Sequence, residues 1–493
     1  MNKIEQIKAE KDGLDVGPEI ATFAREGWEA IPEGDVQRLK WHGVFLRDPT
    51  PGHFMIRIRI TNGITNATQL RTIADISRRQ GGAILDVTTR QQIQLRWLTI
   101  ETVPGIREAL EAVGLTTLQT GMDNIRNVVG CPVAGITPQE LFDASPVARA
   151  FTAAFVGNRA FTNLPRKFNV VITGCRENCT HAESQDIALT PALRDGAVGF
   201  NVAVGGKLGS GGYRIASPLD AFIAPDEAVE VCSQIAFIFR DHGPRDARNH
   251  ARLAFLIEDW GVEKFRLELE RRLGRRLPGA GDDARLPKAT DHIGIFREKR
   301  DGLNYVGLKT PVGRLTADQL DQVAHLSEAY GTGEVRLTTG QNLIVPHVHD
   351  RKIGDLTQEP LLQVLRYDPS EVMRGLVACT GTDFCNLALI DTKGHAMAIA
   401  RRLEKRLSGV RPITVHWSGC PAGCGNHAVA DIGFQGTKAK VDGEVVEAVN
   451  IFVGGKSGPG ARLAEPIMQN VPVTELPQVL ESLLRYYPRR ARA

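Results

Sequence analysis

Four cysteines near the C-terminal end of the chain have the residue type and spacing to hold iron. Cys379 and Cys385 stand in ACTGTDFC, and Cys420 and Cys424 stand in SGCPAGC. Four thiolates suit the corners of a 4Fe-4S cluster, because soft sulfur ligands bind tetrahedral iron. Zinc sites usually separate paired thiols by two to four residues, so the five residues between the first pair are unfavourable for zinc. The spacing favours a 4Fe-4S cluster, with zinc and unligated buried thiols as the alternatives.

The sequences around these cysteines carry a family resemblance. ACTGTDFCNLALIDTK and HWSGCPAGCGNHAVADIGFQG resemble the sirohaem and 4Fe-4S motifs of the nitrite and sulfite reductases. The likeness extends from WHGVF at residue 41 to the last glycine-rich loop. The resemblance implies that all four cysteines hold the cluster and that Cys424 also bridges it to the iron of sirohaem.

The chain also repeats itself once. RITNGITNATQL (59–70) matches KTPVGRLTADQL (309–320), and TGCRENC (173–179) matches SGCPAGC (418–424). A period this long is far beyond that of a solenoid. We infer two halves that descend from one duplicated unit and are related by a pseudo-twofold axis.

Each half begins with alternating apolar residues, as in FMIRIRI and ILDVTT, around a helix-like segment at 68–80. A longer αβ segment follows in each half. We therefore expect an α+β fold in which two ferredoxin-like half-domains join into one domain beside two larger αβ domains for sirohaem and the cluster. The expected segments are an N-terminal extension (1–40), ferredoxin-like half-domains (41–118 and 286–360), a sirohaem domain (119–285), and a sirohaem and 4Fe-4S domain (361–493).

The N-terminal half keeps only part of the thiol pattern. Cys131, Cys175 and Cys179 match three of the four cysteines above, and Thr137 occupies the place of the missing one. Three thiolates would leave one iron of a cube open. We interpret these cysteines as duplication relics packed in a core, with a second metal site as the alternative.

The complete cysteine set is in the C-terminal half, whereas a set of cationic residues is found only in the N-terminal half. Period-two alternation puts Arg57 and Arg59 on one face of their strand. The duplicate positions of Arg57 and Arg90 are Gly307 and Gly340, so only the N-terminal half carries this positive set. Guanidinium groups bind oxyanions and carboxylates through charge-assisted hydrogen bonds, which favours an anion site over a solvated face.

The resemblance assigns roles to individual residues of this half. The side chains expected over the face of sirohaem where substrate binds are Arg57 in FMIR, Arg126 in MDNIRN, and Lys167 and Asn169 in LPRKFN. Those expected to contact the cofactor are Arg90, Thr89 and Gln91 in DVTTRQ, together with Cys424. One active site per chain follows, at the interface between the halves.

Asn169 indicates the substrate. Sulfite-reducing members generally have K-x-K where this chain has Lys167 and Asn169, and a second ammonium suits a dianion better than a neutral amide does. The resemblance therefore implies six-electron reduction of nitrite to ammonia, with reduction of sulfite to sulfide as the alternative. Arg57 and Arg126 would neutralise the anion, and Lys167 would deliver protons with a pKa depressed by neighbouring cations.

Two further functions stay open at this point. Precorrin-3B synthase, a cobalamin-pathway oxygenase, resembles this family and keeps a cluster, but it should lack the complete set of Arg57, Arg126, Lys167 and Asn169. An electron carrier or binding module would have the cluster without a tetrapyrrole. The visible spectrum separates the carrier from the reductase.

The composition of the chain limits the kinds of partner that we expect it to bind. The net charge is only +3, and no apolar stretch approaches the roughly 20 residues that span a bilayer, so neither nucleic acid nor a membrane is expected. The charged N-terminus MNKIEQIKAEKDG predicts a cytoplasmic location. No dinucleotide motif follows a predicted strand, so electrons come from outside, by the resemblance from ferredoxin, or alternatively from a separate NAD(P)H-dependent subunit. We expect a monomer.

Overall fold

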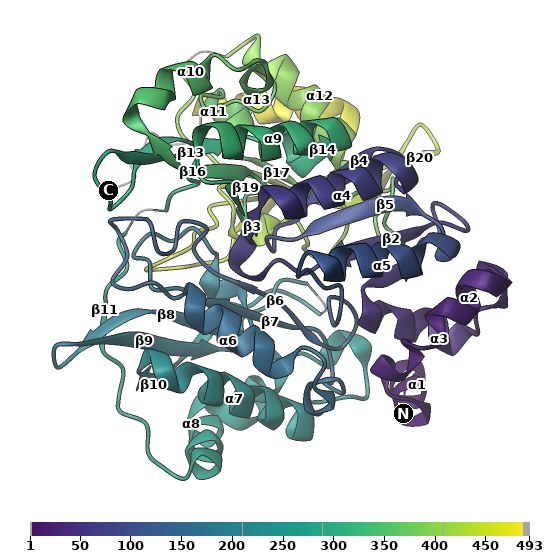
Figure 1. Cartoon of the computed structure of the whole chain (residues 1–493), viewed down its shortest axis with the longest axis vertical. Coiled ribbons are helices and arrows are strands. Elements are labelled where there is room, and N and C mark those ends of the chain that lie inside the picture. The colour runs from purple at the N-terminus through teal and green to yellow at the C-terminus, as the bar shows by residue number, and fades with distance from the viewer. Residues whose placement is uncertain (1, 210, 288, 408, 487–493) are drawn as a thin grey trace.

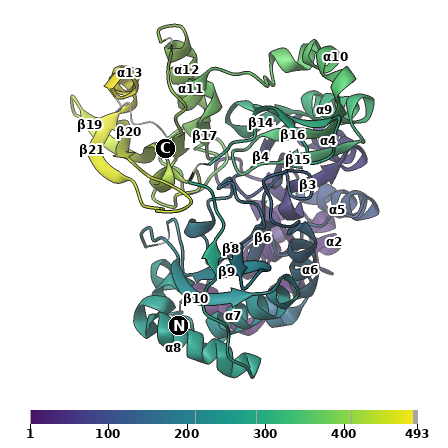
Figure 2. The same cartoon turned by 90° about the vertical axis from the view of Figure 1, so that its left-hand side faces the viewer.

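The computed structural model describes residues 2–486 except 210, 288 and 408. In this range the strands form four sheets that fall into two matching pairs. Figure 1 shows the half-domain sheets with their helices in the upper part of the molecule and the larger N-terminal domain, in teal, below them. Figure 2 shows the larger C-terminal sheet, with β19 to β21 in yellow and green, as a separate layer.

The two half-domains exchange strands. β3 (Ile64–Asn66) of the first half pairs with β15 (Glu334–Leu337), and β14 (Arg314–Thr316) of the second pairs with β4 (Ile84–Val87). The sheet orders are β1-β2-β5-β4-β14 and β12-β13-β16-β15-β3, so neither sheet is complete without the other half. The remaining strands are β1 (Val44–Leu46), β2 (Phe54–Ile58), β5 (Ile93–Leu98), β12 (Gly294–Arg297), β13 (Leu303–Leu308) and β16 (Leu343–His349).

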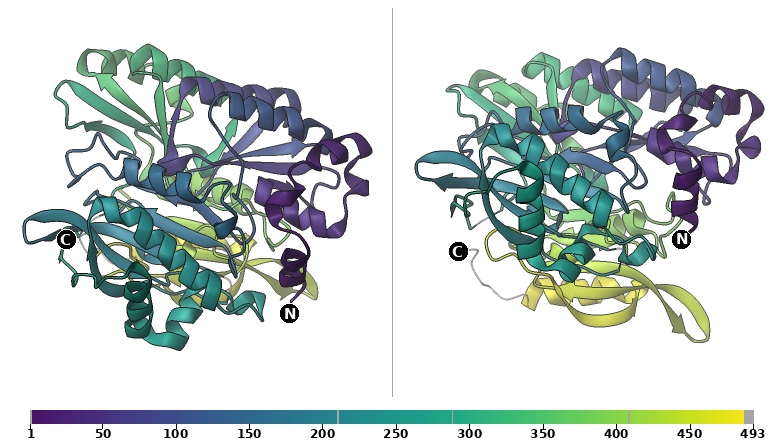
Figure 3. Two further views of the ribbon diagram at one scale, coloured as in Figure 1. Left: turned by 60° about the horizontal axis from the view of Figure 1, so that its bottom comes forward. Right: turned by 90° about the horizontal axis from the view of Figure 1, so that it is seen from below.

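Helices α4 (Ala67–Gln80) and α9 (Ala317–Tyr330) lie side by side over these sheets (Figures 1 and 3). Each starts with a capping box. The side chain of the residue before the helix accepts a hydrogen bond from the backbone N–H three residues later, and the Gln side chain at that later position accepts one from the backbone N–H of the first residue. Apolar residues at helical spacing, such as Leu70 and Ile73 in α4, are fully buried in one shared core with their counterparts in α9. The halves thus form a single domain.

The two larger sheets share one topology. β6 (Ile125–Val129), β7 (Phe168–Ile172) and β8 (Ile187–Arg194) run parallel, and β9 (Ala197–Val204) and β10 (Ser217–Ile223) continue antiparallel. The second sheet repeats this pattern with β17 (Leu376–Ala378), β18 (Val415–Ser418), β19 (Ile432–Val441), β20 (Glu444–Val453) and β21 (Glu465–Pro472). The cysteine-bearing loops follow the first two parallel strands of each sheet, at the edge where carboxyl ends of parallel strands meet.

Helices cover these sheets and the N-terminal flank. The helices of the larger domains are α6 (Ser145–Phe155), α7 (Ala228–His242), α8 (Leu253–Leu273), α11 (Glu371–Arg374), α12 (Thr392–Glu404) and α13 (Leu476–Tyr486). Those of the N-terminal segment and half-domains are α1 (Lys3–Glu10), α2 (Ile20–Glu26), α3 (Glu33–Arg38), α5 (Val103–Ala112) and α10 (Ile353–Thr357). Within the described range, no helix has the length and apolar character needed to cross a bilayer.

The α+β prediction and the pseudo-twofold repeat are confirmed by this architecture. The N-terminal segment packs against the first half-domain, because Val16, Ile20 and Phe23 enter its core. Between the two halves, the described part of segment 277–291 contains one strand, β11 (Asp282–Asp283), which pairs with Ala192 and Leu193 of β8. We propose the five predicted segments as the domain division of the chain.

The strand exchange predicts a difference between two glycine variants. Gly63 and Gly114 both have left-handed backbones, with φ of 70° and 74°. A Cβ at Gly63 would lie 2.4 Å from the carbonyl oxygen of Leu337 in the other half, whereas one at Gly114 meets open space. Gly114→Ala should lower the free energy of unfolding by about 1 kcal/mol, from backbone strain alone. Gly63→Ala should lower the free energy of unfolding by roughly 3 kcal/mol or more, because the clash with the Leu337 carbonyl oxygen adds to the backbone strain.

Chemical denaturation of the two variants beside the parent protein measures both losses. Equal losses would contradict a tight contact between the exchanged halves.

Candidate active site

A cavity at the seam between the two halves gathers many of the residues singled out from the sequence, although Gln91, Arg126, Lys167 and Asn169 are not among the residues that line it. It is lined by arginines of the first half and by all four C-terminal cysteines: Arg47, Arg57, Arg90, Cys379, Cys385, Cys420 and Cys424. Thr89 also contributes to the wall. Arg47 directly follows β1, Arg57 lies in β2 and Arg90 lies in the turn after β4, whereas the thiols come from the loops that follow β17 and β18.

The thiol side of the cavity is built for a multi-iron centre. No three of its four sulfur atoms lie within 4.8 Å of one another, which is wider than a single metal ion requires. The Gly419 N–H donates to the Cys379 sulfur over 3.1 Å, and the Thr392 hydroxyl donates to the Cys379 carbonyl over 2.6 Å. Burial raises the pKa of Cys379 to about 12 and that of Cys420 to about 11. Thiolates at these positions therefore need a bound cation, and the donor set fits a 4Fe-4S cluster.

Arg57 and Arg126 converge on one backbone oxygen. Both donate to the Thr120 carbonyl, over 2.9 Å and 2.7 Å, and Arg126 also donates to the carbonyl of Met122 over 2.8 Å. The Arg57 guanidinium stacks 4.8 Å from the centre of the Phe45 ring. Neutral groups thus fix the two side chains in place without cancelling their charge.

The positive charge of these arginines is not neutralised by carboxylates of the described chain. Within that chain, no carboxylate forms an ion pair with Arg57, Arg90 or Arg126, and the Nε atoms of Arg90 and Arg126 are buried without a partner. Burial and then Arg126 and Arg47 lower the pKa of Arg57, although a guanidinium stays protonated in proteins. A macrocycle with carboxylates and an anionic substrate would relieve this repulsion, so these residues fit sirohaem.

Lys167 directly precedes β7 and Asn169 is the second residue of that strand, so strand alternation puts their side chains on the same face. The Asn169 N–H donates over 2.8 Å to Asp186, whose carboxylate pairs over 2.5 Å with Arg252; both charged side chains are fully buried. The Asn169 Oδ1 atom is buried without a partner. The pKa of Lys167 is well below its usual value, first because of burial and then because of Arg252 and Arg90. The sequence indicated the direction but attributed it to neighbouring cations alone.

The two remaining predicted cofactor contacts differ in position. The Thr89 hydroxyl donates to the Cys424 carbonyl over 3.0 Å and so joins the halves beside the cavity. Gln91 is fully buried behind the wall, where its amide nitrogen donates to Gly130 and Leu337 and its oxygen accepts from the Gly130 N–H. Both amide hydrogens are therefore used, so the prediction of a cofactor contact at Gln91 finds no support in its hydrogen bonds.

Sequence reasoning missed several residues of the site. Arg47 and Lys393 line the cavity, and Asp86, also in the wall, pairs with Arg96 and Arg314. Arg47 had one signal, since it lies in the segment that resembles the family. No sequence pattern predicts the ion pair between Arg252 and Asp186, which are 66 positions apart in the chain.

Family models match four segments that together cover most of the chain. The "Nitrite and sulphite reductase 4Fe-4S domain" matches residues 121–277 and 370–493, and the "Nitrite/Sulfite reductase ferredoxin-like half domain" matches 47–113 and 297–362. The chain belongs to the nitrite and sulphite reductase family. Its alternation of the two domain types is the duplication seen in the fold.

Individual members of the nitrite and sulphite reductase family match nearly end to end. The ferredoxin--nitrite reductase of Synechococcus elongatus is 48% identical over 98% of this chain and 96% of its own. The chloroplastic ferredoxin--nitrite reductase of Zea mays is 42% identical over 98% of this chain and 89% of its own. The structure of Mycobacterium tuberculosis NirA superposes with a TM-score of 0.94 at 32% identity, over 98% of this chain and 93% of NirA.

Two arginines of one strand region give a stability prediction. Arg57 faces the cavity, whereas Arg59 is buried and donates to four backbone carbonyls, those of Leu118, Gln119, Ile125 and Arg126. Arg59→Met leaves those carbonyls without a donor and should cost about 3 kcal/mol or more in unfolding free energy. Arg57→Met removes a repelling charge and should change it by less than about 1 kcal/mol.

Denaturation of the cofactor-free form of each variant measures these two costs. Equal destabilisation would mean that Arg57 has a structural role like that of Arg59.

Proposed function

We propose that this protein is a ferredoxin-dependent assimilatory nitrite reductase that reduces nitrite to ammonia with six electrons. The observation that carries the proposal is the half-buried pair of Arg57 and Arg90, which line one cavity together with the thiols of Cys420 and Cys424. Arg126 is joined to Arg57 through the Thr120 carbonyl, and within the described chain none of the three arginines pairs with a carboxylate. The relatives named ferredoxin--nitrite reductase at 42% and 48% identity support the substrate and the donor.

The cofactor positions follow from the donor atoms. Cys379, Cys385, Cys420 and Cys424 would hold the 4Fe-4S cluster, while Arg90 and Thr89 would contact sirohaem. When bound, sirohaem supplies the iron at which the oxyanion is reduced, and the cluster supplies electrons one at a time. The backbone carbonyl of Cys424 accepts a hydrogen bond from Thr89 of the other half, so Cys424 would hold the cluster and contact sirohaem.

Arg57 and Arg126 would bind and orient the anion. Their guanidinium groups are fixed by the Thr120 carbonyl before substrate arrives, so little reorganisation is needed when negative charge develops. Lys167 would deliver protons, since its lowered pKa eases transfer from the ammonium. Forming ammonia from nitrite consumes seven protons and six electrons, and an eighth proton gives ammonium, so water must reload Lys167 between transfers.

Asn169 would set the preference for nitrite. Its backbone is fixed by the buried pair of Asp186 and Arg252, and its Oδ1 atom has no partner within the described chain. A neutral amide beside Lys167 gives the site one charge fewer than a second lysine would. That charge balance favours a monoanion over a dianion. The monomeric state and cytoplasmic location predicted from the sequence belong to the same proposal.

Steady-state turnover with reduced ferredoxin tests the function. We expect ammonia from nitrite at a kcat/KM well above that for sulfite, and methyl viologen should replace ferredoxin as an artificial donor. Arg57→Met should raise KM for nitrite and lower kcat. Turnover of sulfite alone would overturn the proposal.

Asn169→Lys tests the specificity assignment. The added ammonium should shift the nitrite-to-sulfite ratio of kcat/KM toward sulfite by about tenfold, equivalent to roughly 1.4 kcal/mol. Asn169→Gln, which keeps the amide, is the matched control and should retain the preference for nitrite. If Asn169→Lys left the ratio unchanged, the role given to Asn169 would be wrong.

A further inference from the structure

The three cysteines of the N-terminal half lie close to a histidine that the sequence did not single out. Cys131 follows β6, and Cys175 and Cys179 follow β7, so the carboxyl ends of two adjacent parallel strands bring their loops together. His292 comes from the segment just before β12. Each of these four residues is at least nine-tenths buried.

The spacing of the donor atoms suits one metal ion. The sulfur atoms of Cys131 and Cys179 and a ring nitrogen of His292 all lie within 4.8 Å of one another, and no other set of three such donors in the described chain does so. Zn–S bonds of about 2.3 Å in a tetrahedron place neighbouring ligands about 3.8 Å apart. The C-terminal thiols are spread more widely, so the two thiol sets suit different centres.

His292 has an unused ligand atom. Its Nδ1 atom lies 3.1 Å from the Tyr305 hydroxyl, and its Nε2 atom is buried without a partner. A histidine ligand commonly makes a hydrogen bond through one ring nitrogen and binds the metal through the other. The backbone of His292 is left-handed, with φ of 57°, an unusual conformation for a side chain of this size.

We propose that Cys131, Cys179 and His292 bind one Zn²⁺ ion, in a site separate from the sirohaem cavity. Cys175 supplies a further donor, because its thiol contacts that of Cys131. Two thiolates balance the charge of Zn²⁺, so Cys131, Cys179 and a neutral His292 add no net charge to the interior, and Cys175 as the fourth ligand of the tetrahedron would add one negative charge. The ion would join the loops after β6 and β7 to the chain that enters the second half-domain.

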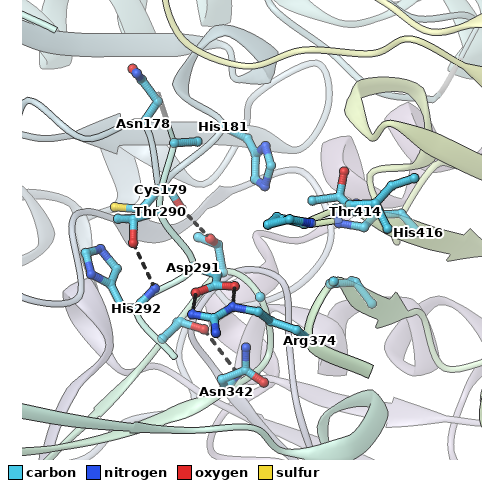
Figure 4. Close-up of a pocket in the computed structure, with 18 of the residues that line it drawn as sticks. Asn178, Cys179, His181, Thr290, Asp291, His292, Asn342, Arg374, Thr414 and His416 are labelled. Carbon is cyan, nitrogen blue, oxygen red and sulfur yellow. Dashed lines mark hydrogen bonds and ion pairs between the residues drawn. The ribbon is translucent and has the colours of Figure 1, made fainter. Parts of the chain in front are cut away.

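The surroundings are consistent with a structural rather than a catalytic ion. Val133, Ala134, Ile136 and Ile344 pack around the thiols in one apolar cluster. Figure 4 shows the Cys179 sulfur and the His292 ring on the same side of a neighbouring pocket. Asp291 and Arg374, which also line that pocket, form an ion pair of 2.7 Å with each other, so the Asp291 carboxylate is already engaged by a cation.

Metal analysis of the purified holoenzyme tests the site. Zinc and iron are measured in the parent protein, in His292→Ala and Cys131→Ser, and in the control Cys232→Ser, whose thiol is fully buried in α7. We expect one zinc per chain in the parent protein and the control, and a decrease of about tenfold or more in the two ligand variants, with iron unchanged. Absence of zinc from the parent protein, or its full retention in both ligand variants, would overturn the proposal.

X-ray absorption at the zinc edge keeps the proposal testable if the variants fail to fold. In the parent protein it should give Zn–S distances of about 2.3 Å and a Zn–N distance of about 2.0–2.1 Å. A shell of oxygen ligands alone would show zinc bound elsewhere and would also overturn the site.

Discussion

The structure depends on the complementarity of charge across one seam. Arg57, Arg90 and Arg126 are held there without a carboxylate partner in the described chain, and burial lowers the pKa of each. The facing thiols Cys379 and Cys420 have raised pKa values for the same reason. Each wall alone is electrostatically unfavourable. Anionic carboxylates against the first wall and iron against the second remove both penalties, so the cofactors complete the folded protein as well as its chemistry.

Duplication makes this seam possible. Because β3 and β14 are exchanged, the two half-domains share one core and hold the larger domains at a fixed separation. Gln91 and Gln341 show how closely the halves correspond: Gln91 bonds Gly130 and Leu337, and Gln341 bonds Ala378 and Val87 at the duplicate positions. One module kept the cations and the other kept four thiols.

The sequence predicted the elements better than their packing. Cysteine spacing and the repeat identified the cluster loops and the pseudo-twofold fold, because both are encoded in local residue types. Alternation placed Arg57 and Arg59 on one face, but not which would face the cavity; that depends on carbonyls of residues 118–126. The approach of His292 to Cys131 and Cys179 could not be predicted either, since it joins distant loops.

The iron anomalous signal in crystals of the purified protein tests this arrangement most directly. The structure predicts strong density among Cys379, Cys385, Cys420 and Cys424, and a separate iron between those thiols and Arg57, within a macrocycle whose carboxylates meet the arginines. Iron bound away from the seam, or arginines turned from the cavity with no tetrapyrrole beside them, would contradict it.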